Sequence, residues 1–335
     1  MDVPLGIRRG RIMSGVLVVR PSSLGDIVYA LALVSDIATH RPELAVDWIA
    51  EDAFVELVQL DPRIRRVIPL ALRRWRHAPF KAATRREMAL FRRNVRETEY
   101  DAILNLQEQL KGAVVSWFAR GVRHGPDRAN IREPIATLVD DVHHAVSRDL
   151  HLVDRCRGLA AAALGYEAVG SPRWHLVPPR DAPNMPAEPF AMIFHATSRT
   201  DKLWPEECWR ELVAHLGGAG IVTLLPWGNA DDERRSRRVA DDVPGAVVPP
   251  RMSLTELATL IRSAEVVVGV DTGLTHLAAA MGTSVVAIFT STDPALAGVA
   301  AVGAHAQDAG GNGRVPSFDE VVAAVAKLLR QAPRC

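Results

Sequence analysis

VVVGVDTGLTHLAAAMG, residues 266–282, joins an apolar, β-branched strand directly to a helix. A single glycine would be enough for the turn at this junction, but the sequence places four unusual residues there: Asp271, Thr272, Gly273 and His276. Glycine lets the backbone turn tightly and approach a ligand, while Thr272 and the free amides of the first helical turn can donate to an anion. Asp271 is costly beside an anion unless it accepts from sugar hydroxyls. The stretch therefore predicts a site for an anion attached to a sugar, with a core-facing side chain as the alternative for His276.

The same strand–helix alternation continues on both sides of this stretch. GVLVV (15–19) is followed by a helical pattern over 27–40 and by the strand LAVDWIAE (44–51). From residue 190 the alternation of strands and helices begins again, with the strand FAMIFHAT (190–197) and a helix over 205–218. Continuous apolar strands alternating with helices are typical of parallel sheets that are covered on both faces. The predicted fold is therefore α/β, with two Rossmann-like doubly wound domains that face a cleft.

The length of 335 residues also favours two domains, because a single hydrophobic core rarely grows so large. A stretch rich in proline, 170–189, separates the two halves. We expect the following boundaries: an N-terminal tail at 1–14, an N-terminal domain at 15–169, a linker at 170–189, a C-terminal domain at 190–312, and a C-terminal helix at 313–335 that packs back on the N-terminal domain.

Composition and charge narrow the function classes. The net charge of +1 argues against nucleic acid as a partner, although Arg and Lys are dense over 63–96, which leaves a local anionic partner open. The cysteines, Cys156, Cys208 and Cys335, lack metal or disulfide spacing. No apolar run approaches the roughly 20 residues of a membrane helix, and 1–14 lacks the apolar core of a secretory signal. We expect a cytoplasmic protein.

Three further clusters stand at predicted strand ends. Asp26, in RPSSLGD (20–26), is either a helix-start residue or a carboxylate able to take a proton from a substrate hydroxyl. Lys202, in HATSRTDKLWPEE (195–207), lies just before a helix start, where phosphate binds readily. Asp231, Asp232 and Glu233 either stabilise a helix dipole or accept from ribose hydroxyls. Because two Rossmann-like domains bind ligands at the carboxyl ends of their strands, in the crevice between the domains, these clusters predict one nucleotide-sugar site.

Several motifs of other nucleotide-binding and metal-binding proteins are missing from the sequence. No G-x-G-x-x-G follows the first strand, and no G-x-x-x-x-G-K-[ST] occurs, which argues against a nicotinamide enzyme and a P-loop NTPase. No Asp-x-Asp stands on a strand-end loop where it could hold a divalent metal. The residues therefore favour a metal-free nucleotide-sugar transferase without a cofactor.

The motifs SSLGD, VIPLALRRWR, HATSRTDKLWPEE, LLPWG and VDTGLTHLAAAMG occur in this order over nearly the whole chain. In this order they resemble those of the lipopolysaccharide heptosyltransferases, and RRWR with DKLWPEE resembles the heptosyltransferase I group. The resemblance implies a glycosyltransferase of the B type that moves L-glycero-D-manno-heptose from ADP-heptose to the first Kdo of Kdo2-lipid A. It also implies inversion at the sugar carbon, no metal, and peripheral contact with the cytoplasmic face of the inner membrane of a Gram-negative bacterium.

The resemblance also assigns site residues. Asp26 matches the family's general base. Basic residues that would face the anionic acceptor match Arg73, Arg76 and Arg132. The ribose acid matches Asp232 or Glu233, and the choice stays open. The remaining donor contacts would come from Thr197, Lys202, Asp271, Thr272, Gly273 and His276. The alternatives are heptosyltransferase II, a nucleotide-sugar epimerase of the same architecture, and a nucleotide-sugar binding protein without turnover.

Overall fold

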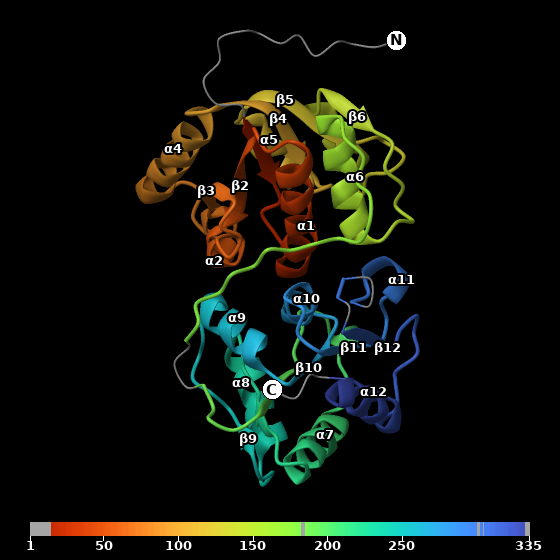
Figure 1. The fold of residues 1–335 in the computed structure, drawn as a ribbon. Coiled ribbons are helices and arrows are strands. Elements are labelled where there is room, and N and C mark those ends of the chain that lie inside the picture. Colours follow the sequence, from red (N-terminus) through yellow and green to blue (C-terminus); the bar gives the residue numbers. More distant parts are fainter. Residues whose placement is uncertain (1–14, 182–184, 300–301, 304, 332–335) are drawn as a thin grey trace.

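The computed structural model describes residues 15–181, 185–299, 302–303 and 305–331. Its strands form two six-stranded sheets, and all the strand pairs within them are parallel. Helices cover both sheets, and the two domains lie one above the other in Figure 1. The predicted α/β fold of two Rossmann-like domains is confirmed.

The N-terminal domain is built from the first half of the chain. Its strands are β1 (Gly15–Val19), β2 (Ala45–Glu51), β3 (Ile64–Leu70), β4 (Glu99–Asn105), β5 (Arg120–Pro126) and β6 (Val142–His144). Its helices are α1 (Leu24–His40), α2 (Val55–Val58), α3 (Leu72–His77), α4 (Ala82–Arg96), α5 (Leu110–Trp117) and α6 (Leu152–Leu164), with 3-10 turns η1 (Asp52–Phe54) and η2 (Pro134–Val139).

The C-terminal domain repeats this plan. Its strands are β7 (Phe190–Phe194), β8 (Val222–Leu224), β9 (Ala246–Val247), β10 (Val266–Val270), β11 (Val285–Phe289) and β12 (Ala306–Gly310). Its helices are α7 (Glu206–Gly218), α8 (Ala230–Ala240), α9 (Leu254–Ser263), α10 (Gly273–Ala280), α11 (Pro294–Ala297) and α12 (Phe318–Gln331), with the 3-10 turn η3 (Thr200–Lys202).

The strand order is the same in both sheets. The first runs β3-β2-β1-β4-β5-β6, and the second runs β12-β11-β10-β7-β8-β9, which is the same order seen from the other side. All five residues of β1 and all five of β10 are buried, as expected for central strands covered on both faces. The order reverses between β1 and β4, and between β7 and β10. Ligands of such sheets bind beyond the strand ends at these switch points.

The C-terminal helix differs from the expectation. Instead of packing back on the N-terminal domain, α12 packs on β10, β11, β12 and α7 of its own domain. Val321, Val325 and Leu328 join the core of the second sheet, because burying this apolar stripe there covers a sheet face that would otherwise be open. The predicted tail, 1–14, lies outside the described residues.

The basic segment 72–96 lies within the stretch where the sequence is dense in Arg and Lys, and it is largely helical. Residues 72–77 form α3 and residues 82–96 form α4. Phe91 and Val95 on α4 are buried against the sheet, while the arginines of the helix face outward. This pattern makes α4 amphipathic. No helix in the described part of the chain is long and apolar enough to cross a membrane.

Candidate functional site

The two domains touch where the N-terminus of α1 meets the N-terminus of α10 (Figure 1). A side chain at Gly273 would place its Cβ 2.4 Å from Leu24 Cδ2 and 2.7 Å from the amide of Gly25. At Gly25, a Cβ would lie 3.3 Å from the ring of His276. The two glycines therefore let the helices approach closely. Gly269 makes room for the Thr275 hydroxyl in the same way, 2.2 Å from where a Cβ would stand, so its role is packing.

Asp26 lies at this contact, in the first turn of α1. One oxygen, Oδ2, accepts from both the amide and the hydroxyl of Ser23, each at 2.9 Å. The other, Oδ1, forms a 2.7 Å ion pair with the buried Arg20. Asp26 therefore closes the helix start and also lines the cleft, and its role as a proton acceptor stays a prediction.

These contacts set the charge of Asp26. Burial raises the pKa of a carboxyl group, but the Arg20 guanidinium and the Ser23 hydrogen bonds outweigh it, and the pKa of Asp26 falls below its usual value. Arg20 also donates to the carbonyl of Leu106, which fixes its position. The carboxylate is thus ionised at neutral pH and able to accept a proton.

Asp271 anchors the second half of the site. Its Oδ2 accepts from Lys202 Nζ and from the Thr292 hydroxyl, each at 2.6 Å. Its Oδ1 lies 3.1 Å from His276 Nε2. Burial raises the pKa of Asp271, but His276, Lys202 and Thr292 together hold it far below the usual range. Within the protein, Asp271 thus pairs with Lys202 and contacts His276, and its predicted contact with sugar hydroxyls stays a prediction.

His276 is buried and lies between the domains. Its Nδ1 is 3.1 Å from the hydroxyl of Tyr29 on α1, and that hydroxyl donates to the carbonyl of Ala297 at 2.7 Å. Burial, followed by Asp271, raises the pKa of Tyr29 well above its usual value, so the hydroxyl keeps its proton. His276 is therefore buried and also lines the cleft, and its contact with a donor stays a prediction.

Two adjoining cavities open at the cleft. A cavity of about 410 Å³ is lined by Asp26, Lys202 and Asp271, together with Arg73, which lies over the ring of Phe54. A second, of about 590 Å³, continues into the C-terminal domain. The residues that line both are Leu24, Phe54, Thr197, Ser198, Thr272 and Gly273. A ligand with two parts could therefore span the two spaces.

The larger cavity separates the two candidate ribose acids. Asp232 lines it beside Trp227 and accepts from the side-chain amide of Asn229 at 2.8 Å. Glu233 instead pairs with Arg237 on the surface of α8, at 2.7 Å. Of the two acids, Asp232 is the one in position to meet a ligand.

The predicted acceptor arginines do not all line the same space. Arg73 lines the cavity that holds Asp26, and Arg76 lines a separate apolar groove of the N-terminal domain. Arg132 is exposed and lines neither the two cavities nor the groove. Sequence reasoning missed Lys111, whose Nζ lies 3.3 Å from the Ser22 hydroxyl. The signal for it was a charge shortly after the strand end at Asn105.

Sequence reasoning also missed Arg20 and Tyr29. Arg20 directly follows a fully buried strand, and such a charge is unusual there unless it has a partner. Tyr29 carried no signal, because it falls within an apolar helix pattern. Among the residues that the structure describes, no group of three or more His, Cys, Asp or Glu side chains is arranged to hold a metal ion.

Comparison with known proteins shows the family to which this chain belongs. Residues 88–321 match glycosyltransferase family 9 (heptosyltransferase). Lipopolysaccharide heptosyltransferase 1 of Salmonella typhimurium is 38% identical over 286 residues, covering 84% of this chain and 90% of the relative. Lipopolysaccharide heptosyltransferase 2 of Escherichia coli is 23% identical over 305 residues, covering 83% of each.

Solved structures agree. E. coli heptosyltransferase WaaC with ADP superimposes with a TM-score of 0.86 at 34% identity, covering 94% of this chain and 99% of that one. WaaC with ADP-2-deoxy-2-fluoro heptose superimposes with a TM-score of 0.81 at 34% identity, covering 95% and 99%.

Two Rossmann-like domains around a polar cleft, matched over nearly their whole length, define a glycosyltransferase. The chain belongs to glycosyltransferase family 9, the heptosyltransferases. The resemblance found in the sequence motifs is confirmed.

Proposed function

We propose that this heptosyltransferase is of type I and moves L-glycero-D-manno-heptose from ADP-heptose to the first Kdo of Kdo2-lipid A. The type rests on the relatives, since identity is 38% to a heptosyltransferase 1 and 23% to a heptosyltransferase 2. The donor rests on WaaC, which has been solved with ADP and with a fluorinated ADP-heptose.

The observation that carries the proposal is one shared cavity. Asp26, from the switch point of the first sheet, and Lys202, from that of the second, line the same space of about 410 Å³. A proton acceptor and a cation for a leaving group are therefore supplied from opposite domains. This is the arrangement that a transfer between two bound substrates needs.

The donor would span both cavities. The adenosine would occupy the larger one, with its base against Trp227 and its ribose hydroxyls donating to Asp232. The diphosphate would lie at the shared wall, near Thr197, Thr272 and Gly273, where the first amides of α10 point toward it. The ion pair with Asp271 would hold Lys202 in place, and the contact between Asp271 and His276 would fix the start of α10.

The chemistry would be a single displacement. Asp26 takes the proton of the attacking Kdo hydroxyl, whose oxygen forms a bond to the anomeric carbon of heptose while the bond to ADP breaks. Attack from the face opposite the leaving group inverts that carbon. Lys202 and the α10 amides would stabilise the charge of the departing diphosphate, so we propose that no metal is required.

The acceptor would be held by the N-terminal domain. Arg73 and Arg76 would meet the carboxylates and phosphates of the glycolipid, for which guanidinium groups are well suited. Arg132 would take part only at a distance from the cavity, since it lies outside it. The exposed arginines of α4 would favour the anionic cytoplasmic face of the inner membrane, where we place the protein as a peripheral enzyme.

The test is to incubate the full chain with ADP-heptose and deacylated Kdo2-lipid A and to weigh the product. A mass increase of one heptose is expected. A parallel reaction with an acceptor that already carries the first heptose separates the types, because a type II enzyme would use only that acceptor. Conversion of ADP-heptose with no acceptor present would instead indicate an epimerase.

A further inference from the structure

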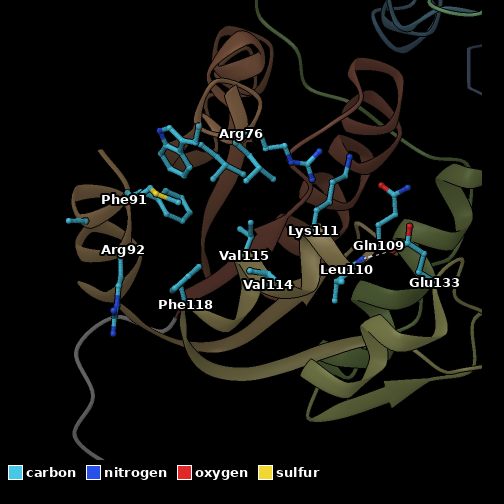
Figure 2. Close-up of a pocket in the computed structure, with 15 residues that line it drawn as sticks. Arg76, Phe91, Arg92, Gln109, Leu110, Lys111, Val114, Val115, Phe118 and Glu133 are labelled. Carbon is cyan, nitrogen blue, oxygen red and sulfur yellow. Dashed lines mark hydrogen bonds between the residues drawn. The ribbon is translucent and has the colours of Figure 1, made fainter. Parts of the chain in front are cut away.

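A large apolar groove lies beside the cleft in the N-terminal domain. It measures about 930 Å³ and runs between α3 and α4 on one side and α5 on the other. Figure 2 shows Phe91 and Phe118 facing the same space, with Val114 and Val115 along one wall. The remaining apolar lining includes Leu72, Trp75 and Met88. Apolar surface of this extent, left open on a folded domain, generally marks a binding site.

The groove has a cationic end. Arg76 and Lys111 point toward each other at one end, whereas Arg92 lies at the opposite end (Figure 2). The polar groups of Gln109 and Glu133 stand at one corner, where Glu133 accepts from the Leu110 amide at 2.8 Å. A ligand that fits must therefore have an apolar body and an anionic head.

The cationic end is continuous with the cleft. Lys111 lies 3.3 Å from the hydroxyl of Ser22, in the loop that leads to Asp26. Burial and the neighbouring Arg73 lower the pKa of Lys111, which places this lysine among the charges of the cleft. A molecule with its head near Arg76 and Lys111 thus has its reacting group within reach of Asp26, while its apolar part enters the groove.

We infer that this groove binds a fatty acyl chain of the glycolipid acceptor. The inference rests on the proposed function, since it extends the acceptor site from the anionic sugars to the lipid. The choice of occupant follows from charge complementarity and position: a glycolipid has anionic groups next to acyl chains, and the groove has cations next to an apolar channel. An amphipathic peptide would be the other occupant, and the first experiment distinguishes it.

Binding of an acyl chain in the groove is tested directly by tryptophan fluorescence. Trp75 lines the groove and is one of seven tryptophans, so Trp75→Phe identifies its share of the signal. The probe is dodecyl phosphate with bromine on the chain, because bromine quenches a tryptophan that it touches. We expect saturable quenching in the wild type that is lost in Trp75→Phe. Absence of quenching of Trp75 would overturn the inference and leave a peptide as the candidate occupant.

A matched pair of variants tests whether the alkyl chain of the probe binds in the groove. Val114 lines the groove and Val122 lies outside it, and their side chains are similarly exposed, at 45% and 44%. Val114→Glu should weaken quenching by the brominated probe about tenfold, the effect of losing about two buried methylene groups. Val122→Glu introduces the same charge and should leave the affinity unchanged. Equal loss in both variants would overturn the inference.

Transfer kinetics link the groove to the acceptor. For Kdo2-lipid A that retains its amide-linked chains, Val114→Glu should raise KM about tenfold. The KM of the fully deacylated acceptor and that of ADP-heptose should stay unchanged. If Val114→Glu impaired both acceptors equally, the groove would have only a structural role. If neither acceptor were used by the wild type, the proposed function would fail, while the quenching result would still decide whether the groove takes a chain.

Discussion

Replacing Asp26 by Asn tests the proposed base and has two separable effects. Asparagine keeps the shape and can still accept from Ser23, but it cannot take a proton. The turnover kcat should therefore fall by about 10² to 10⁴-fold, the range for loss of a general base. The KM for ADP-heptose should stay near its original value, because Asp26 lies on the acceptor domain. The assay is the initial rate of ADP release with both substrates varied.

The same change also affects stability, since Arg20 loses its charged partner. The Arg20 side chain is 8% exposed and that of Asp26 is 30% exposed. Because the pair is not fully buried, we expect a loss of about 1–3 kcal/mol in the free energy of unfolding at pH 7, the cost of a poorly satisfied polar group. The folded pKa of Asp26 is lowered, so its contribution is present above the unfolded pKa and is lost as the pH falls. The gap between wild type and variant should therefore close below about pH 4.

Asp36→Asn provides the control. Asp36 also lies on α1 and pairs with a buried arginine, Arg157, at 2.8 Å, but outside the cleft. It should lose comparable stability and keep its kcat. Retention of most turnover by Asp26→Asn, or an equal drop in kcat for Asp36→Asn, would refute the assignment of Asp26 as the base.

Four further outcomes are expected. Lys202→Ala should weaken ADP-heptose binding by on the order of 10- to 100-fold, the loss of a charged hydrogen bond, measured by calorimetry; unchanged affinity would mean that the lysine serves only Asp271. Asp232→Asn should weaken ADP binding, whereas Glu233→Gln should not, and the reverse order would exchange their assignments. Excess EDTA should leave the transfer rate intact, and recovery of a lost rate by Mg²⁺ or Mn²⁺ would contradict a metal-free mechanism. Gly273→Ala should destabilise the protein by about 1–3 kcal/mol in urea titrations, because its Cβ would collide with the first turn of α1; a neutral effect would show that the helices separate easily.

The central elements could be predicted from the sequence because local pattern and burial agree there. β1 and β10 are uninterrupted apolar runs, and both are completely buried. β5 and β12 could not be predicted in this way, since their sequences, RGVRHGP and AQDAG, carry polar residues and glycine in place of an apolar pattern. Both lie near the sheet margins, where one face or edge reaches solvent and hydrophobic signals are weak.

The sequence could predict which residues lie at the site, but it could not predict which side chains they pair with. A strand end that leads into a helix is a local feature, and it placed Asp26, Lys202 and Asp271 at the cleft. The ion pair between Lys202 and Asp271 joins residues 69 positions apart, and only the folded sheet brings them together. The open choice between Asp232 and Glu233 had the same cause, because the direction of each side chain depends on how α8 packs.

The placement of α12 affects the order in which the chain can fold during synthesis. Since α12 completes the second sheet, the elements of the first domain all fall within residues 15–164. Once this stretch has left the ribosome, the six strands of its sheet and helices α1 to α6 are all present, and the segment that follows adds Trp174, whose indole donates to the Val28 carbonyl at 2.7 Å. Domains generally fold as units in the order of synthesis. The half that carries Asp26 can thus form its sheet while the half that carries Lys202 is still being translated, and the contacts of α1 with α10 form afterwards.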